Sequence, residues 1–373
     1  MKKILLIAGE VSGDHHGAAL VKEIKKLDND IQFFGVGGAA LAGAGMELIV
    51  HLESMAFLGI GEIIRHLPYI QKVRKKLLDK AKTEKPDCAI LIDYPGFNLR
   101  MAASLKKLNI PVIYYISPQL WAWGKGRVKK IKKYVERMIV LFPFEREFYA
   151  KYGINAFYSG HPIVDYHASW LPDKPKEFDP QNIVLGLLPG SRTQEVNSLL
   201  PEMIQTAAVL HQAGKVNRVE ILKTEHLPGE LYKKHIMGFD DFIKISEKPI
   251  YKVLPKYDVV LTASGTATLE AGYFGVPMVV VYKVNAFTYF LARRLIKIKH
   301  IGLVNIVAEK EVAIELIQHD FSAEKAAAAI GRLLEKKEHE HKRRELSLIA
   351  KKLGKPGASG RAAREVVRFL TDA

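Results

Sequence analysis

Short runs of aliphatic residues alternate with segments of helical periodicity along most of the chain. In the first half these runs cover residues 4–8, 31–36, 88–92, 111–116 and 138–142. The pattern resumes with runs at residues 183–188, 219–222, 242–245, 259–261 and 278–281. Continuous rather than alternating runs predict parallel strands that are buried on both faces. Two such series predict an α/β protein with two Rossmann-like, doubly wound domains, whose ligand loops face a cleft.

The same pattern predicts the domain boundaries. We expect an N-terminal domain at residues 1–168, a linker at 169–182 that contains three prolines, and a second domain at 183–345. Helices fill residues 346–373, and their last part, residues 359–370, places its apolar residues on one side. This last helix is expected to dock on the N-terminal domain or on a partner chain, which leaves a homodimer open.

Composition narrows the class of protein. The chain has 373 residues, of which 48% are hydrophobic and 26% charged, so it is an ordinary globular sequence. Lys and Arg number 56 against 40 Asp and Glu, a net charge of +16, which favours an anionic partner such as a nucleic acid, an acidic membrane surface or a phosphorylated substrate. The single cysteine, Cys88, excludes an internal disulfide, and no apolar stretch reaches the roughly 18 residues that span a bilayer. We expect a cytosolic protein.

The first loop that could carry chemistry follows the first predicted strand. It contains five candidate substrate-binding residues: Gly9, Glu10, Ser12, Gly13 and Asp14. The two glycines permit a tight turn, and the N–H groups of a helix that starts near Ser12 suit an anion. The loop lacks the GxGxxG pattern, which disfavours a dinucleotide. A simple capped strand-to-helix turn is the alternative interpretation.

Asp93 is the candidate general base. It stands just past a very apolar strand, where a carboxylate is poorly solvated, a property that favours proton abstraction. The alternative is a helix N-cap before Pro95. Neighbouring His15 and His16 diverge on a helix, and HExxH is absent. We therefore expect no catalytic metal.

Two loops in the second half have the composition of a nucleotide-diphosphate site. The first contains Gly190, Ser191 and Arg192, and the second contains Ser264, Gly265 and Thr266. Small residues let the backbone approach a phosphate, helix N-termini supply donors, and an arginine adds a bidentate cation. Glu270 could accept hydrogen bonds from ribose hydroxyls. The GxxxxGK[ST] motif is absent, which argues against an ATPase, and two ordinary strand–helix turns are the alternative.

Residues 57–76 combine an apolar stripe with basic residues. This pattern suits the interface of an anionic bilayer, although a core-facing helix with solvated basic residues is the simpler interpretation. A second basic run, residues 125–133, follows Trp121 and Trp123, but no nucleic-acid-binding motif accompanies it, so a nucleic-acid partner is not favoured. The candidate membrane-contact residues are Ile60, Ile63, Ile64, Leu67, Ile70, Lys72, Arg74, Lys75 and Lys76.

Taken together, the motifs resemble those of the lipid-A-disaccharide synthase family. Agreement runs in order from residue 4 to about residue 307 and becomes loose in the C-terminal helices. The matching segments are AGEVSGD (8–14), LGIGEII (58–64), IDYPGFN (92–98), YYISPQLWAW (114–123), FPFE (142–145), GHPIVD (160–165), LLPGSR (187–192) and ASGTATLE (263–270).

The resemblance implies a metal-independent, inverting glycosyltransferase of the B-type fold, with no cofactor. The implied reaction joins UDP-2,3-diacylglucosamine to 2,3-diacylglucosamine 1-phosphate (lipid X), giving a β-1,6-linked disaccharide 1-phosphate and UDP. Asp93, Arg192 and Asn305 are the implied catalytic residues, and Glu270 matches the ribose-binding acid of related enzymes. Because both substrates carry acyl chains, the resemblance also implies a peripheral position on the anionic cytoplasmic face of the inner membrane.

Three positions depart from the family pattern. Gly96 stands where a second acid is common, Val304 replaces a proline before Asn305, and Glu309 replaces a frequent glycine. A B-type-fold epimerase or transferase acting on soluble UDP-N-acetylglucosamine is the runner-up. A basic binding protein without enzymatic activity is the third interpretation.

Overall fold

The computed structural model describes residues 1–55, 66–121, 125–172, 176–284, 289 and 299–372. The chain divides into two compact units. Within the described ranges, the first holds parts of Met1–Asp165 and Leu353–Ala373, and the second holds parts of Tyr166–Leu291 and Ile298–Lys352. The division after Asp165 lies three residues before the boundary expected at 168.

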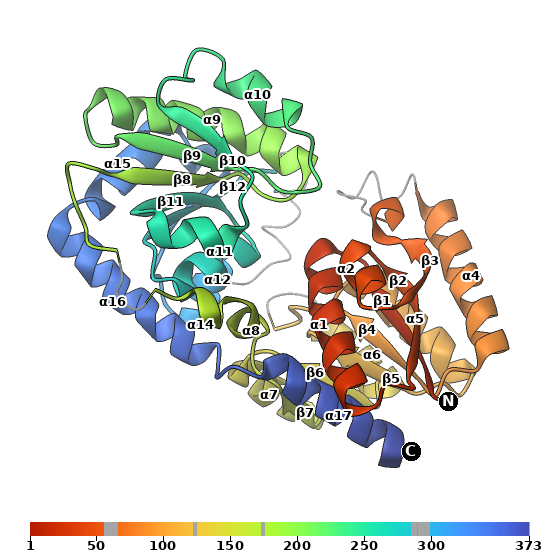
Figure 1. Ribbon diagram of the computed structural model, residues 1–373. Helices are drawn as coiled ribbons and strands as arrows, with labels where there is room; N and C mark the ends of the chain where they lie inside the picture. Colours follow the sequence, from red (N-terminus) through yellow and green to blue (C-terminus); the bar gives the residue numbers. More distant parts are fainter. Residues whose placement is uncertain (56–65, 122–124, 173–175, 285–288, 290–298, 373) are drawn as a thin grey trace. The chain divides into compact units, whose positions relative to one another are not determined.

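In the described part of the first unit, seven parallel strands form a sheet in the order β3-β2-β1-β4-β5-β6-β7 (Figure 1). The strands are β1 (Lys3–Ala8), β2 (Gln32–Gly37), β3 (Glu47–His51), β4 (Cys88–Ile92), β5 (Val112–Tyr115), β6 (Arg137–Val140) and β7 (Ala156–Tyr158). The helices are α1 (Val11–Leu27), α2 (Ala39–Gly43), α4 (Leu67–Glu84), α5 (Pro95–Lys107), α6 (Val128–Tyr134), α7 (Pro143–Ala150), α8 (Ile163–His167), which ends in the second unit, and α17 (Ala358–Asp372).

The described residues of the second unit form a sheet of six parallel strands in the order β10-β9-β8-β11-β12-β13. These are β8 (Val184–Leu188), β9 (Arg218–Leu222), β10 (Ile243–Ser246), β11 (Val259–Ala263), β12 (Met278–Tyr282) and β13 (Ile314–Ile317). The helices are α9 (Thr193–Gln212), α10 (Glu230–Ile236), α11 (Ile250–Val253), α12 (Thr266–Tyr273), α14 (Leu303–Ala308), α15 (Ala323–Leu333) and α16 (Lys336–Lys352). Short 3-10 helices are η1 (Leu52–Met55), η2 (Lys125–Arg127), η3 (Ala168–Trp170), η4 (Leu254–Lys256) and η5 (Gln318–Asp320).

Both sheets confirm the predicted fold class. Each predicted aliphatic run corresponds to a strand, and the central strands β1, β4 and β8 are almost wholly buried. The sequence pattern missed β3, β7 and β13, which all lie at sheet edges. Edge strands are short and half-exposed here, so they lack the continuous aliphatic run that identifies a strand covered on both faces.

The strand order reverses at one point in each sheet. In the first unit the first strand, β1, lies between β2 and β4, and Ala8 pairs with Ile92. In the second unit the first strand, β8, lies between β9 and β11, and Leu188 pairs with Thr262. Loops that follow such neighbouring strands leave a crevice at the carboxyl edge of the sheet, where ligands of open α/β sheets bind.

The C-terminal helices belong to different units. α17 packs against α1 of the same chain, whereas α16 lies in the second unit. Residues 335–344 form a strongly charged run in the sequence, and His339 within it is buried. Its Nε2 lies 2.9 Å from the carbonyl oxygen of Asp258, and its ring stacks on Phe178. Among the described helices, none is long and apolar enough to cross a membrane.

Candidate active site

The loop after β1 lies beside the loop after β4. α1 begins at Val11, directly after Glu10, so Ser12 and Gly13 lie in its first turn. A Cβ at Gly9 would lie 2.5 Å from Cδ1 of Tyr94, which means that the Tyr94 ring covers this glycine. Burial raises the pKa of Tyr94, and the negative charge of Glu10 raises it further. The two loops therefore form one packed surface at the switch point of the first sheet.

Asp14 does not have the substrate-facing role that we expected. Its side chain is buried, and its carboxylate accepts hydrogen bonds from the backbone N–H groups of Gly38 (2.6 Å), Ala40 (3.0 Å) and Leu41 (3.2 Å). These are the donors at the N-terminus of α2, which have no partner within that helix. Asp14 thus fixes the start of α2 and, through it, the position of the α1 loop.

Asp93 lies at the carboxyl end of β4 with a half-buried side chain. Its backbone is held from several sides. Its N–H donates to the carbonyl of Tyr115, and its own carbonyl accepts hydrogen bonds from Asn98 Nδ2 at 2.8 Å and from the Tyr114 hydroxyl. The Asp93 side chain is thereby carried on a rigid backbone, which suits a group that must meet a substrate in one geometry.

Backbone strain is concentrated at this edge of the sheet. Asp93 and Tyr94 both have φ of 44°, and Ile116, just after β5, has φ of 66°. Aspartate tolerates the left-handed region, whereas a bulky or β-branched residue there is an outlier. Such conformations persist where the surroundings enforce them, and they cluster at functional sites.

The sequence analysis missed Glu145 as a titrating group. Its buried carboxylate accepts hydrogen bonds from the N–H groups of Leu141 and Phe142, each at 3.1 Å, at the start of α7. Burial raises the pKa of Glu145 to about 7. The available signal for this structural role was a glutamate at the third position of a helix that begins with Pro143.

In the second unit, Glu195 holds the loop between β8 and α9. Its carboxylate accepts hydrogen bonds from Ser191 N at 3.0 Å and from Arg192 Nη1 at 3.3 Å. Gly190 has φ of 107°, and a Cβ there would lie 2.3 Å from Glu195 Oε2. Arg192 is the N-cap of α9, and 40% of its side chain is exposed. The loop therefore presents a guanidinium beside a helix N-terminus, an arrangement that suits a phosphate.

Two side chains from the segment after β9 support this loop, and the sequence analysis did not identify them. The Thr224 hydroxyl donates to the Gly190 carbonyl at 3.1 Å, and His226 Nε2 lies 2.9 Å from the Ser191 carbonyl oxygen. With these carbonyls engaged, the loop has one defined backbone conformation. No motif signals the pair, because their partners lie more than 30 residues earlier in the chain.

The loop between β11 and α12 is the neighbour of the Arg192 loop. Gly265 is the N-cap of α12, and a Cβ there would meet nothing within 4 Å. Thr266 is the first helical residue and is half-buried. The hydroxyl of Ser264, however, donates to the carbonyl of Ile301 at 3.0 Å, and its N–H donates to Val281. Ser264 therefore anchors the loop, while Gly265 and Thr266 offer the open approach to α12.

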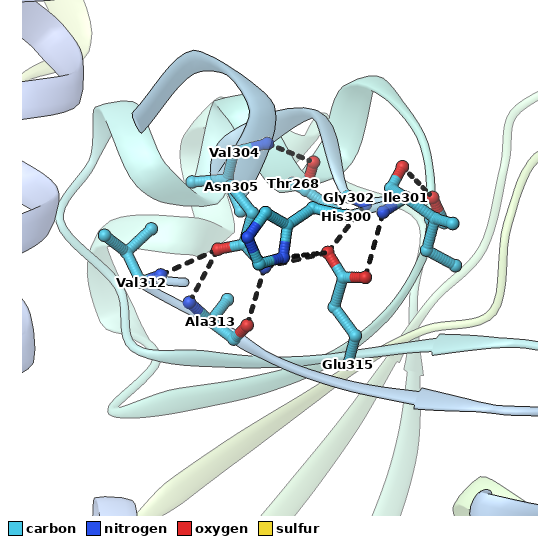
Figure 2. A network of polar contacts seen from close by, with 10 residues as sticks. Thr268, His300, Ile301, Gly302, Val304, Asn305, Val312, Ala313 and Glu315 are labelled. Atoms are coloured by element: carbon cyan, nitrogen blue, oxygen red, sulfur yellow. Dashed lines mark hydrogen bonds and ion pairs between the residues drawn. The ribbon is translucent and has the colours of Figure 1, made fainter. Parts of the chain in front are cut away.

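Asn305 does not have the direct catalytic role that we expected. It is fully buried, and its side chain makes four hydrogen bonds (Figure 2). Its Nδ2 donates to the Ala313 carbonyl and to Glu315 Oε1, and its Oδ1 accepts from the N–H groups of Val312 and Ala313. Glu315 in turn accepts from the N–H groups of Ile301 and Gly302. An amide with all four positions satisfied holds structure together and is not free to contact a substrate.

The network in Figure 2 also reaches the α12 loop. Thr268 Oγ1 lies 3.4 Å from Val304 N in this network. The same hydroxyl donates to the Gly265 carbonyl at 2.8 Å. Ile301, whose N–H binds Glu315, accepts the Ser264 hydroxyl. Asn305 therefore acts as a positioning residue for the loop that carries Gly265.

Glu270 lies one turn into α12, and 16% of its side chain is exposed. Its Oε1 lies 2.8 Å from Nε2 of His167, which is buried at the end of α8. The sequence analysis did not identify His167. It lies 103 residues from Glu270, in a segment without a recognisable binding motif.

The candidate membrane residues divide into three groups. Ile60, Ile63 and Ile64 lie outside the described residues. Ile70 is half-buried and packs against the hydrophobic core of the first unit, and its membrane contact stays a prediction. Leu67 is half-buried, and the basic residues follow it along α4, with Lys72, Lys75 and Lys76 exposed and Arg74 half-buried. Core contact explains the buried stripe of α4, formed by Val73, Leu77 and Ala81, and leaves its basic side facing water.

Comparisons with known proteins decide the family. The family model described as lipid-A-disaccharide synthetase matches residues 4–366. The chain belongs to the lipid-A-disaccharide synthase family. It is 40% identical to the lipid-A-disaccharide synthase of Geobacter metallireducens, over 99% of this chain and 97% of the relative. It is 41% identical to that of Syntrophus aciditrophicus, over 97% and 96% of the two chains. The chain is therefore an enzyme of the glycosyltransferase class.

Solved structures show the same fold at low identity. The UDP-GlcNAc 2-epimerase of Neisseria meningitidis, solved with UDP-GlcNAc bound, superposes with a TM-score of 0.64 at 13% identity over 100% of both chains. The calicheamicin glycosyltransferase CalG4 superposes with a TM-score of 0.62 at 16% identity, over 100% of this chain and 98% of its own. These similarities establish the B-type glycosyltransferase fold. The epimerase interpretation is not favoured, because the family model and both relatives named above are lipid-A-disaccharide synthases.

The described residues hold no cluster of three or more His, Cys, Asp or Glu side chains arranged to bind a metal ion. For a lipid-A-disaccharide synthase, these residues offer two groups. A carboxylate lies at the switch point of the first sheet, and a cation lies beside open helix N-termini at the switch point of the second sheet. The first is suited to accept a proton, and the second is suited to bind a diphosphate.

Proposed function

We propose that the protein joins UDP-2,3-diacylglucosamine to 2,3-diacylglucosamine 1-phosphate, forming a β-1,6-linked disaccharide 1-phosphate and UDP. The family match across residues 4–366 supports the substrate class. The observation that carries the mechanism is the position of Asp93, at the carboxyl end of β4 beside the switch point of the first sheet, on a backbone held by Asn98 and Tyr114.

In the proposed mechanism Asp93 accepts the proton of the acceptor 6-hydroxyl. The oxygen attacks the anomeric carbon of the donor sugar, the bond from that carbon to the diphosphate breaks, and UDP leaves with the bonding electrons. One direct displacement inverts the anomeric configuration. Asp93 is a single carboxylate for this task, because Gly96 stands where the resemblance to the family makes a second acid common.

Stabilisation of the leaving UDP falls to the second unit. Arg192 neutralises charge on the diphosphate, and the N-termini of α9 and α12 add N–H donors, with the open approach at Gly265 and Thr266. Glu270 accepts hydrogen bonds from the ribose hydroxyls. These groups supply the positive charge that a divalent metal would otherwise provide, so we propose that turnover is independent of metal ions.

The lipid substrates bring the protein to a membrane surface. We propose that the exposed basic side of α4, with Lys72 and Lys75, contacts the anionic headgroups of the cytoplasmic face of the inner membrane. The apolar residues at 60, 63 and 64 precede this helix in the sequence and would enter the acyl region.

The test of the proposed function is UDP release from UDP-2,3-diacylglucosamine in detergent micelles, with and without 2,3-diacylglucosamine 1-phosphate, in excess EDTA. Acceptor-dependent release in EDTA supports both the transfer and its independence of metal. Asp93→Asn keeps the size of the side chain and tolerates the left-handed backbone. It should abolish turnover while UDP binding, measured by calorimetry, survives. Release from plain UDP-N-acetylglucosamine, but not from the acylated donor, would contradict the proposal.

A further inference from the structure

His167 makes one polar contact in the described part of the chain. Its Nε2 lies 2.8 Å from Oε1 of Glu270, and its Nδ1 has no hydrogen-bond partner among the described residues. Because an ionised carboxylate can only accept, the Nε2 of His167 carries the proton and donates it to Glu270. The imidazole therefore acts as a hydrogen-bond donor to this carboxylate.

An aromatic cage fixes His167. Its ring centroid lies 5.6 Å from that of Tyr251, 5.5 Å from that of Phe274 and 6.3 Å from that of Tyr273. The ring centroid of Trp170 in turn lies 4.9 Å from that of Tyr251. With 3% of its surface exposed, His167 cannot rotate without displacing these rings. It therefore presents a rigid donor to Glu270.

The contact acts on a carboxylate that is partly exposed. Glu270 is more exposed than its partner, and the hydrogen bond engages only Oε1, so Oε2 stays available as an acceptor. A flexible glutamate would lose conformational entropy when it binds a ligand, and a donor that already holds the side chain removes this cost. Phe274 and Tyr273 come from α12 or its C-terminal end, so the cage is continuous with the helix that carries Glu270.

We propose that His167 is a positioning residue that holds the Glu270 carboxylate in the orientation in which it accepts hydrogen bonds from the ribose of a uridine nucleotide. This inference rests on the proposed function, which assigns Glu270 to the ribose. It adds a residue outside both nucleotide loops, and it makes selection between ribose and deoxyribose depend on an aromatic cage.

The experiment compares binding of UDP and 2′-deoxy-UDP by calorimetry. We expect the full-length protein to prefer UDP, and His167→Phe to reduce this preference roughly tenfold, to the level of Glu270→Gln, because the phenyl ring fills the cage but donates no hydrogen bond. His167→Gln restores a donor and should recover part of the preference. His211→Phe is the matched control: His211 lies at the opposite end of α9 from Arg192 and stacks on Phe242, so its loss should leave the preference unchanged.

The outcomes separate this inference from the proposed function. His167→Phe could weaken the binding of both nucleotides equally, or it could leave the full preference for UDP. In either case His167 does not position Glu270, and the inference is wrong. An unmodified protein that catalyses the transfer but binds both nucleotides equally also overturns it, while the proposed function stands. If the unmodified protein neither binds UDP nor catalyses the transfer, the proposed function fails and the inference fails with it.

Discussion

The ring of Tyr94 covers the α-carbon of Gly9 so closely that no side chain fits between them. A Cβ at Gly9 would lie 2.5 Å from the ring, and Tyr94 directly follows Asp93 in a strained turn. Gly9→Ala should therefore displace Tyr94 and, through the shared backbone, Asp93. We expect kcat to fall by at least tenfold, since displacement of a reacting group by about 1 Å can cost on the order of a hundredfold.

Gly96→Ala is the control for this substitution. Gly96 lies in the first turn of α5, and a Cβ there would meet nothing within 4 Å. Alanine in place of a helical glycine should stabilise the fold by about 0.5–1 kcal/mol and leave kcat unchanged. Steady-state kinetics and thermal unfolding of both variants test this pair. Equal kcat values for Gly9→Ala and the unmodified protein would show that the Tyr94 contact does not position Asp93.

Asp14→Ala tests the structural role of Asp14. The substitution leaves the N–H groups of Gly38, Ala40 and Leu41 without their carboxylate, in a buried place that water does not readily enter. We expect the free energy of unfolding to fall by about 3 kcal/mol. UDP affinity should stay within about twofold, because Asp14 lies in the first unit and the proposed nucleotide loops lie in the second.

Urea unfolding and calorimetry measure these two quantities. Asp30→Ala, at an exposed aspartate that follows α1, should change neither the free energy of unfolding nor the UDP affinity. A variant of Asp14 with native stability and lost substrate affinity would restore the binding role that the sequence suggested.

The loops of the candidate site could be predicted because strand ends can be read from the hydrophobic pattern. The runs that became β1, β4, β8 and β11 ended beside Gly9, Asp93, Gly190 and Ser264, and a parallel sheet brings the carboxyl ends of its strands to one edge. The partner of each side chain could not be predicted. Asp14 binds groups 24 residues away and Glu270 binds one 103 residues away, and neither contact has a local signal.

Asn305 shows the same limit. An amide in a family motif suggests chemistry, yet its four hydrogen bonds within the fold leave it no capacity for a ligand. Burial decides between the two roles, and burial depends on β13, an edge strand that the sequence pattern did not reveal.

Asn305→Asp should destabilise the protein more than Asn305→Ala does. Alanine leaves buried partners unsatisfied, which costs about 3 kcal/mol. Aspartate adds a second carboxylate where the amide lies 2.8 Å from Glu315 Oε1, so repulsion between like charges is added at neutral pH. Urea unfolding at pH 7 ranks the variants. Native stability together with a kcat reduced more than a hundredfold in Asn305→Ala would instead indicate direct catalysis.

Lys72→Glu combined with Lys75→Glu should weaken binding to anionic vesicles. Both lysines are exposed on α4, and each basic residue near such a surface contributes about 1 kcal/mol, so loss of both positive charges should reduce vesicle affinity roughly thirtyfold, and the added negative charges should reduce it further. Lys336→Glu with Lys337→Glu makes the same change of charge in the second unit and is the control. Vesicle sedimentation at low and physiological salt measures the effect. Equal losses in the two double variants would point to net charge rather than to a surface on α4.

Glu145 should make the stability of the protein fall as pH rises toward neutral. Its pKa in the folded state is about 7, above the ordinary value of 4.5, because the carboxyl is buried. Between these two values the folded state holds a proton that the unfolded state has released. The folded state therefore binds more protons, and the free energy of unfolding decreases with rising pH across this window, by up to about 3 kcal/mol.

Glu145→Gln removes this dependence. The glutamine amide stays neutral, and its oxygen can still accept from the N–H groups of Leu141 and Phe142. The variant should match the unmodified protein near pH 4.5 and exceed its stability at pH 8, with the difference growing from about pH 5 and levelling above pH 7. Urea unfolding at half-unit steps of pH measures the difference in the free energy of unfolding between the two proteins. The contributions of all other titrating groups cancel in this difference. Glu147→Gln, at an exposed position of the same helix, should give a curve parallel to that of the unmodified protein. A parallel curve for Glu145→Gln would show that Glu145 is ionised in the folded state throughout this range.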